Sequence, residues 1–236
     1  MKNLIIASTS TLYGGDYLDY LMPEIEQLFA SCTTIIFIPY ARPGGVSHDD
    51  YTSKVRTAFM KINKSVKGLH EYENPEAAIE EAEGIFTGGG NTFLLVHQLY
   101  KSNVLEVLKK AIQKGVPYLG CSAGSNITGI SMQTTNDMPI IYPPSFATLE
   151  AIPFNLNPHY LDADLQSKHM GETRETRIKE FHAFNETPVL GLREGSWLKV
   201  DGDKILLKGT LTARLFRKNQ SPEEIKPDSD LSFFKK

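Results

Sequence analysis

The five residues Gly-Cys-Ser-Ala-Gly at positions 120–124 have the types and spacing of a nucleophile turn. In the G-x-S-x-G pattern a strand turns sharply into a helix, and small residues are needed because the backbone is crowded there. The turn would hold the hydroxyl of Ser122 clear of the main chain. The first N–H groups of the following helix would face negative charge near that hydroxyl, so Ala123 N–H is a candidate oxyanion donor. The pattern predicts nucleophilic catalysis by Ser122.

Cys121 is a rival nucleophile in the same turn, since related α/β folds use cysteine at such a turn. Side chains alternate between the two faces of a strand, so the strand before Ser122 would point Cys121 into the sheet. We therefore interpret Cys121 as a small buried residue.

A second glycine run, Gly88-Gly89-Gly90-Asn91, also follows a short apolar strand and opens a helix. A phosphate-binding loop is one interpretation of such a run. No Walker lysine follows it, however, and no G-x-G-x-x-G continues from it. Glycines let the backbone approach a substrate carbonyl closely, so the run favours a second oxyanion segment, with the donor at Gly89 or Gly90.

A serine nucleophile needs a base, which is most often histidine. The chain offers six: His48, His70, His97, His159, His169 and His182. His159 follows Asn157-Pro158, where proline and asparagine fix the backbone locally. The surroundings favour His159 but leave the other five open.

The carboxylate that would orient the base is harder to find among 28 acidic residues. Glu194 lies at the end of the apolar strand 189–192, separated from it by Arg193, and it precedes Gly195. Sites form at the carboxyl ends of parallel strands, which makes Glu194 a candidate. Its position alone does not distinguish it from a solvated turn acid.

The elements that must position these residues alternate along the chain. Apolar runs predict strands at 4–7, 34–38, 84–87, 117–121, 188–192 and 197–200. Helical spacing predicts helices within 16–30, with a start or kink at Pro23, and at 47–62, 74 onward, 92–100, 104–114 and after Glu172. This alternation predicts an α/β fold: a mostly parallel central sheet with helices on both faces, ending in antiparallel strands around an Asp201-Gly202 turn. We expect a single domain over residues 1–236, of which 219–236 form a loose polar tail.

Composition narrows the class of protein. The 236 residues are 41% hydrophobic and 22% charged, with a net charge of -3, so we expect no nucleic-acid and no membrane partner. Two widely spaced cysteines do not make a disulfide framework, and the N-terminal apolar run is too short for a signal peptide. We expect a cytoplasmic protein. The sequence leaves open whether it forms a homodimer.

A set of motifs in a fixed order resembles one known family. They are Gly-Cys-Ser-Ala-Gly-Ser-Asn (120–126), Thr-Asn-Asp-Met-Pro-Ile (135–140), Asn-Pro-His-Tyr (157–160), Gly-Glu-Thr-Arg-Glu (171–175) and Glu-Gly-Ser-Trp (194–197), with further matches at 37–41, 88–92 and 213–216. Together they resemble peptidase E, the α-aspartyl dipeptidase family, over about residues 1–217. The resemblance implies a sheet similar to that of class I glutamine amidotransferases.

The resemblance also implies a function and a set of site residues. It implies hydrolysis of dipeptides with an N-terminal aspartate, through an acyl-enzyme on a triad of Ser122, His159 and Glu194. It selects Arg174 as the group that binds the substrate side-chain carboxylate, whereas helical periodicity cannot separate Arg174 from Arg177. Asp137 matches the family's essential acid, which would bind the α-amino group or support its loop. No metal and no cofactor are implied.

Two residues depart from the family pattern. Cys121 stands where the family often has tryptophan, and Arg193 stands where it often has proline. Both could alter specificity. Two alternative functions remain from the sequence alone: a cyanophycinase-like peptidase that acts on an aspartate-rich polymer, and a flavodoxin-like domain that binds a small ligand without catalysis.

Overall fold

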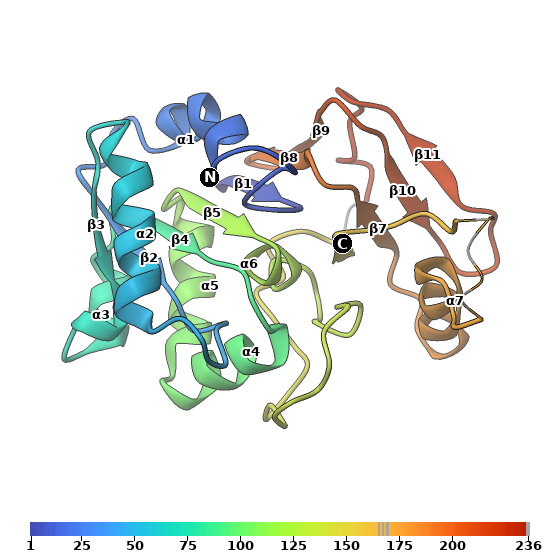
Figure 1. Cartoon of the computed structure of the whole chain (residues 1–236), viewed down its shortest axis with the longest axis horizontal. Coiled ribbons are helices and arrows are strands. Elements are labelled where there is room, and N and C mark those ends of the chain that lie inside the picture. The colour runs from blue at the N-terminus through green and yellow to red at the C-terminus, as the bar shows by residue number, and fades with distance from the viewer. Residues whose placement is uncertain (165, 167, 169, 235–236) are drawn as a thin grey trace.

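A seven-stranded mixed sheet forms the centre of the protein (Figure 1). The computed structural model describes every residue except 165, 167, 169, 235 and 236. The strand order is β3-β2-β4-β5-β1-β8-β9. The strands are β1 (Asn3–Ala7), β2 (Thr34–Ile38), β3 (Ser65–Gly68), β4 (Gly84–Thr87), β5 (Tyr118–Cys121), β8 (Ser196–Asp201) and β9 (Lys204–Gly209). The strands β1 to β5 are parallel to one another, whereas β8 pairs antiparallel with both β1 and β9.

A second sheet of four strands lies beside the first. Its order is β11-β10-β7-β6, and its strands are β6 (Asn155–Pro158), β7 (Val189–Leu192), β10 (Ala213–Phe216) and β11 (Glu223–Ile225). Only β6 and β7 pair in parallel. The prediction of one mostly parallel sheet is therefore not confirmed, because the main sheet is mixed and the strand at 188–192 belongs to the second sheet.

Helices cover both faces of the main sheet. The helix α1 (Met22–Leu28) and the helix α2 (His48–Met60) pack on one face, while α3 (Pro75–Glu80), α4 (Thr92–Lys101) and α5 (Val104–Lys114) pack on the other. The short helix α6 (Ala123–Asn126) follows β5 directly. The helix α7 (Arg174–Phe184) lies beside the second sheet, at the opposite end of the molecule from α2 and α3 (Figure 1).

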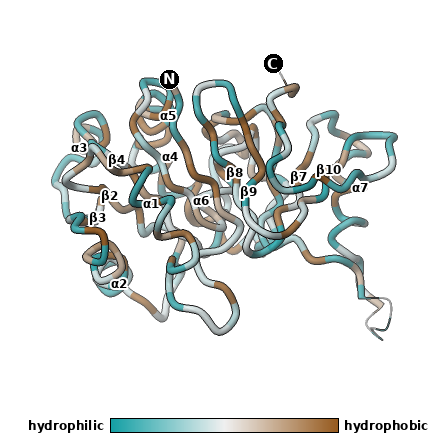
Figure 2. The backbone as a smooth tube through the Cα atoms, turned by 90° about the horizontal axis from the view of Figure 1, so that it is seen from above, coloured by the Kyte–Doolittle hydropathy of each residue, from teal (hydrophilic) through white to brown (hydrophobic). Residues whose placement is uncertain are grey.

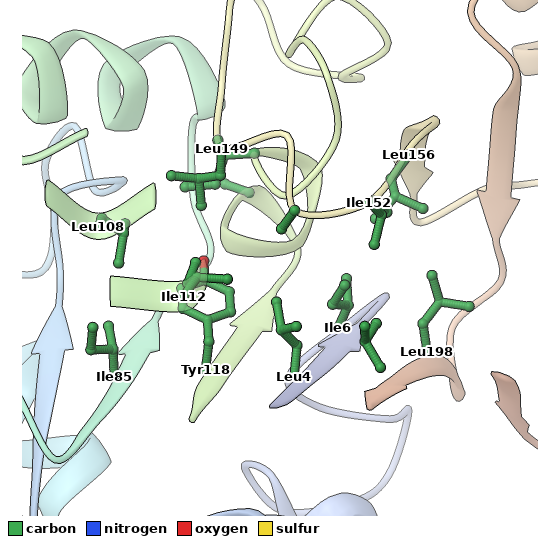
Figure 3. Packing of buried hydrophobic residues seen from close by; sticks show 14 of the residues in the cluster. Leu4, Ile6, Ile85, Leu108, Ile112, Tyr118, Leu149, Ile152, Leu156 and Leu198 are labelled. Carbon is green, nitrogen blue, oxygen red and sulfur yellow. The ribbon is translucent and has the colours of Figure 1, made fainter. Parts of the chain in front are cut away.

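Strand alternation explains why the main sheet is buried on both sides. In β1, Leu4 and Ile6 belong to one apolar cluster, and Ile5 and Ala7 belong to the cluster on the other face. In Figure 3, Leu108 and Ile112 of α5 lie over Ile85, Tyr118 and Leu4 of the strands. The first cluster continues through the second sheet, so the two sheets share one core.

The ends of the helices follow from local chemistry. The side chain of Ser47 accepts the N–H of Asp50 at the start of α2, and Asn74 accepts the N–H of Ala77 at the start of α3. The helix predicted within 16–30 begins only at Met22, with Pro23 in its first turn, where a missing N–H costs nothing.

The C-terminal segment is held by backbone pairing. The strand β11 pairs with β10, Leu231 is buried, and Leu231 N–H donates to Ile205 O at 2.8 Å. The prediction of a loose tail is therefore wrong for the described residues up to 234. Its polar composition concealed the pairing, because edge strands tolerate polar side chains on their exposed face.

Polarity is distributed unevenly along the backbone. Figure 2 shows the α7 end of the molecule as largely hydrophilic, in agreement with only Ile178 and His182 being buried in α7. No helix in the described part of the chain is long and apolar enough to cross a membrane.

We predict that Leu190→Ala lowers the free energy of unfolding by about 2–5 kcal/mol, because Leu190 of β7 is fully buried in the core that both sheets share. Leu161→Ala is the control, since Leu161 is 72% exposed and its truncation should change stability by less than about 0.5 kcal/mol. Urea denaturation measures both. Equal losses would show that the second sheet is not part of the common core.

Candidate active site

Ser122 lies at a sharp turn between β5 and α6. Its backbone has φ 55° and ψ -113°, a conformation that residues with a side chain rarely adopt. The flanking glycines are required by space. A Cβ atom on Gly124 would lie 2.2 Å from Thr87 O, and one on Gly120 would lie 2.5 Å from Gly124 O. The predicted strand–turn–helix at the G-x-S-x-G pattern is present.

Buried hydrogen bonds brace this turn. Ser122 N–H donates to Ala7 O at 3.1 Å, and the buried Tyr118 hydroxyl donates to Gly124 O at 2.8 Å. The hydroxyl of Ser125 lies 2.6 Å from Ala7 O and 2.7 Å from Gly120 O. Because these partners are all buried, the strained conformation of Ser122 is fixed by its surroundings.

The structure brings His159 and Glu194 to Ser122. His159 Nε2 lies 2.9 Å from Ser122 Oγ, and His159 Nδ1 lies 2.6 Å from Glu194 Oε1. His159 directly follows β6, and Glu194 lies in the turn between β7 and β8. The three side chains therefore form one chain of polar contacts that runs from the main sheet to the second sheet.

The buried Ser8 fixes the backbone of His159, and sequence analysis missed it. His159 has φ 54°, and its N–H donates to Ser8 Oγ at 2.9 Å. The same hydroxyl donates to Leu192 O at 2.8 Å, and Leu192 O also accepts Tyr160 N–H at 2.9 Å. A single serine at the end of β1 thus joins the ends of β6 and β7. No sequence motif marks it.

The other candidate histidines are engaged elsewhere. His70 Nε2 contacts Asp49 Oδ1 at 2.8 Å, and the His48 ring lies 5.3 Å from the His70 ring. His97 and His182 contact the carbonyl oxygens of Tyr142 and Thr187. The remaining candidate, His169, lies outside the described residues.

The glycine run lies against Ser122. A Cβ atom on Gly89 would lie 2.9 Å from Ser122 Cβ, so glycine is required there. Gly89 N–H donates to the hydroxyl of the buried Tyr51 at 3.0 Å, and it is therefore not free to bind an oxyanion, contrary to one of the predictions. Gly90 has φ 145°, and its N–H, like that of Ala123, has no acceptor among the described residues.

Asp137 belongs to the loop between α6 and β6, and its side chain contacts the N-terminus of α4. Its Oδ2 accepts hydrogen bonds from Thr92 N–H at 2.7 Å, from Thr92 Oγ1 at 2.6 Å and from Thr135 Oγ1 at 2.9 Å. Asp137 therefore neutralises a helix N-terminus and fixes its own loop. Its Oδ1 has no hydrogen-bond donor among the described residues. Asp137 lines one small cavity together with Ser122 and His159.

Arg174 lines an adjoining cavity. The walls of the two cavities share Thr135 and Asn136. The half-buried Arg174 has no hydrogen-bond or ion-pair partner among the described residues. Burial and the nearby Arg177 lower the pKa of Arg174, while Asp137 raises it. Arg177 lines the same cavity, but its side chain is 60% exposed and faces Glu172 at 4.0 Å.

The structure places both departures from the family pattern. Cys121 is fully buried in the apolar cluster beneath α2, so the prediction of a small buried residue is confirmed, and burial raises the pKa of its thiol well above the usual range. Arg193 binds the carboxylates of Asp162 and Glu224 at 2.8 and 2.9 Å.

Within the described residues, no group of three or more His, Cys, Asp or Glu side chains is arranged to hold a metal ion.

Comparison with known proteins identifies the family of the chain. The family model of peptidase family S51 matches residues 4–208. The chain is 47% identical to peptidase E of Streptomyces coelicolor, covering 98% of this chain and 93% of that protein. It is 46% identical to a protein of Drosophila melanogaster named "Probable alpha-aspartyl dipeptidase", covering 98% and 97% of the two chains.

A solved structure shows the same fold at low sequence identity. The crystal structure of a peptidase from an acI-B1 actinobacterium superposes with a TM-score of 0.74, at 16% identity, covering 99% of this chain and 97% of that one. The family model and the sequence relatives place the chain among the serine peptidases. Within that class, the chain belongs to peptidase family S51.

We predict that a serine-directed phosphonylating probe labels Ser122 in the native protein, because its hydroxyl is exposed to the cavity and contacts His159. His159→Ala should slow labelling strongly, whereas Cys121→Ala should leave the rate unchanged, since that thiol is buried. Peptide mass spectrometry identifies the labelled residue. Labelling of Cys121, or equal rates with and without His159, would contradict the geometry.

Proposed function

We propose that the chain is a serine-type dipeptidase that hydrolyses dipeptides with an N-terminal aspartate through an acyl-enzyme. One observation carries the proposal: His159 lies between Ser122 and Glu194, within hydrogen-bond distance of both. The names of the relatives support the substrate class. Small peptides would be the partners of this site.

The arrangement is suited to acyl transfer. His159 takes the proton of Ser122 Oγ as the oxygen attacks the aspartyl carbonyl, and the carboxylate of Glu194 stabilises the imidazolium that forms. His159 then gives the proton to the leaving amine as the peptide bond breaks. Water, activated by the same imidazole, hydrolyses the aspartyl ester and releases aspartate.

Two backbone donors are available for the developing negative charge. Ala123 N–H and Gly90 N–H have no acceptor among the described residues, and both belong to segments that lie against Ser122. Preorganised donors of this kind stabilise a tetrahedral intermediate, because they need no reorientation during the reaction. Gly89 contributes because it has no side chain: any side chain at this position would collide with Ser122.

Recognition of aspartate is assigned to two charged groups. The guanidinium of Arg174 has no partner among the residues that the structure describes and matches the planar geometry of a carboxylate, so it would bind the aspartate side chain. The Oδ1 atom of Asp137, to which no described residue donates, would accept the α-ammonium group. Because the cavities of Ser122 and Arg174 adjoin, one short substrate could contact all three residues.

We also infer that the main sheet is related to that of class I glutamine amidotransferases. The supporting feature is the nucleophile turn at the carboxyl end of a central parallel strand, β5, between β4 and β1.

We expect Ser122→Ala to lower kcat/KM for Asp-Leu by roughly 10³-fold or more, because the members of such a triad act as a unit. His159→Ala should be nearly as damaging, while Glu194→Gln should retain the geometry but lose the stabilising charge. Steady-state kinetics with folding checked by circular dichroism is the measurement. Retention of most activity by the Ser122→Ala protein would contradict the proposal that Ser122 is the nucleophile.

We expect the wild-type protein to prefer Asp-Leu strongly over Asn-Leu and to act poorly on acetyl-Asp-Leu. An amide cannot accept two charge-assisted bonds from Arg174, which should cost on the order of 2–4 kcal/mol in transition-state binding. Arg174→Lys should also impair turnover, since an ammonium does not replace the planar fork.

Arg177→Ala is the matched control for Arg174→Ala, because it removes the same group three residues away on the same helix. The Arg174 variant should lose discrimination between Asp-Leu and Asn-Leu, and the Arg177 variant should keep it. Comparable wild-type turnover of both dipeptides would reject the carboxylate site. Loss of discrimination only in the Arg177 variant would move the site to that residue.

A further inference from the structure

Arg193 joins two carboxylates that come from distant parts of the chain. Its Nε and Nη2 donate to the two oxygens of Asp162, both at 2.8 Å. Its Nη1 and Nη2 donate to the two oxygens of Glu224 at 2.9 and 3.0 Å. The guanidinium side chain is only 16% exposed, and Nη1 also donates to Thr212 O at 2.9 Å. Bidentate pairs of this kind fix geometry as well as charge.

The two carboxylates are closely matched. The side chains of Asp162 and Glu224 are 47% and 45% exposed. Arg214 lies 3.6 Å from Asp162 and 3.5 Å from Glu224. The hydrogen bonds of Arg193 lower the pKa of each carboxyl below its usual range, so both are ionised at neutral pH.

The two carboxylates differ in the segment that each one anchors. Asp162 lies three residues after His159, and Arg193 is the neighbour of Glu194 in sequence. The Asp162–Arg193 pair therefore connects the segment that carries His159 to the turn that carries Glu194. Glu224, in contrast, lies on β11 at the edge of the second sheet, and Thr212 also binds it.

The network also reaches α7. Arg214 of β10 donates to Glu175 at 2.8 Å, and Glu175 is adjacent to Arg174 in α7. The same group of charges thus contacts all three elements that bring His159, Glu194 and Arg174 to the site.

We propose that Asp162 is a positioning residue: through its bidentate pair with Arg193 it holds His159 at the distance from Glu194 and Ser122 that the reaction requires. The proposal rests on the function proposed above. The backbone of His159 is strained, so its position depends on the contacts that hold its segment. Ser8, Leu192 and Asn136 bind the main chain of residues 158–160, and the Asp162–Arg193 pair holds the part of the segment that follows. Arg193 therefore supplies a contact that a proline in its place would not.

The test compares Asp162→Asn with Glu224→Gln. Each replacement is nearly isosteric, removes one charge and leaves Arg193 with one carboxylate. Three quantities are measured for each variant and the wild type: the midpoint of urea unfolding, kcat and KM for Asp-Leu, and the rate at which the phosphonylating probe labels Ser122. Asp162→Glu, which retains the carboxylate, is the rescue variant.

We expect Asp162→Asn to lower both kcat and the labelling rate by about tenfold, since a displacement of the base by a fraction of an ångström is costly. The two replacements should lower the midpoint of urea unfolding by similar amounts. Glu224→Gln, however, should leave kcat and the labelling rate within about twofold of the wild type. Asp162→Glu should label faster than Asp162→Asn. This combination supports positioning, because a merely structural pair would shift stability alone.

Equal kcat and equal labelling rates in the Asp162→Asn and Glu224→Gln proteins would overturn the proposal. The labelling rate separates this failure from failure of the proposed function, because it needs no peptide substrate. If the wild type labels at Ser122 but does not hydrolyse Asp-Leu, the substrate assignment fails, and the relative labelling rates of the variants still decide the role of Asp162.

Discussion

The conformation of Ser122 is the constraint on which the rest of the structure depends. Holding a serine at φ 55° and ψ -113° costs on the order of 1–3 kcal/mol, which the surrounding packing must offset. The central position of β5, the absent side chains at Gly120 and Gly124, and the hydroxyl of Tyr118 together leave the backbone no alternative. The result is a hydroxyl that faces a cavity, next to two backbone donors that have no acceptor within the described part of the chain.

The second constraint is the junction of the two sheets. Ser122 belongs to the main sheet, whereas His159 and Glu194 come from the ends of β6 and β7 in the second sheet. Ser8 and the continuous apolar cluster bring these ends together. The geometry of the site therefore depends on the packing between the sheets, and the charges around Arg193 bind segments of the second sheet next to His159 and Glu194.

Strongly apolar elements could be predicted from the sequence, and polar ones could not. The strands at 34–38 and 84–87 and the helix at 104–114 have the predicted bounds, because continuous apolar runs and clear helical spacing define them. The strand β6 was not predicted because its sequence, Asn-Leu-Asn-Pro, is polar and ends in proline, which a strand at the edge of a sheet tolerates. Without this strand, nothing in the sequence indicated a second sheet.

The candidate site shows the same division. Ser122 could be found from its local pattern, since the turn itself requires small neighbours. Glu194 required the family resemblance, because nothing local separates it from the other acids. Ser8 and Tyr51 act through single hydroxyl groups across long sequence separations, so no local pattern could reveal them. The role of Arg193 depends on partners 31 residues away in both directions, which only the fold brings together.

The most direct test of the account is to identify the atom that carries the acyl group during turnover. The protein is mixed with the chromogenic substrate Asp-p-nitroanilide, quenched in acid within the first turnover, digested and analysed by peptide mass spectrometry. The account predicts an aspartyl ester on the peptide that contains Ser122, specifically on its hydroxyl, and none in Ser122→Ala. An aspartyl group on Cys121 or on any other side chain would contradict it.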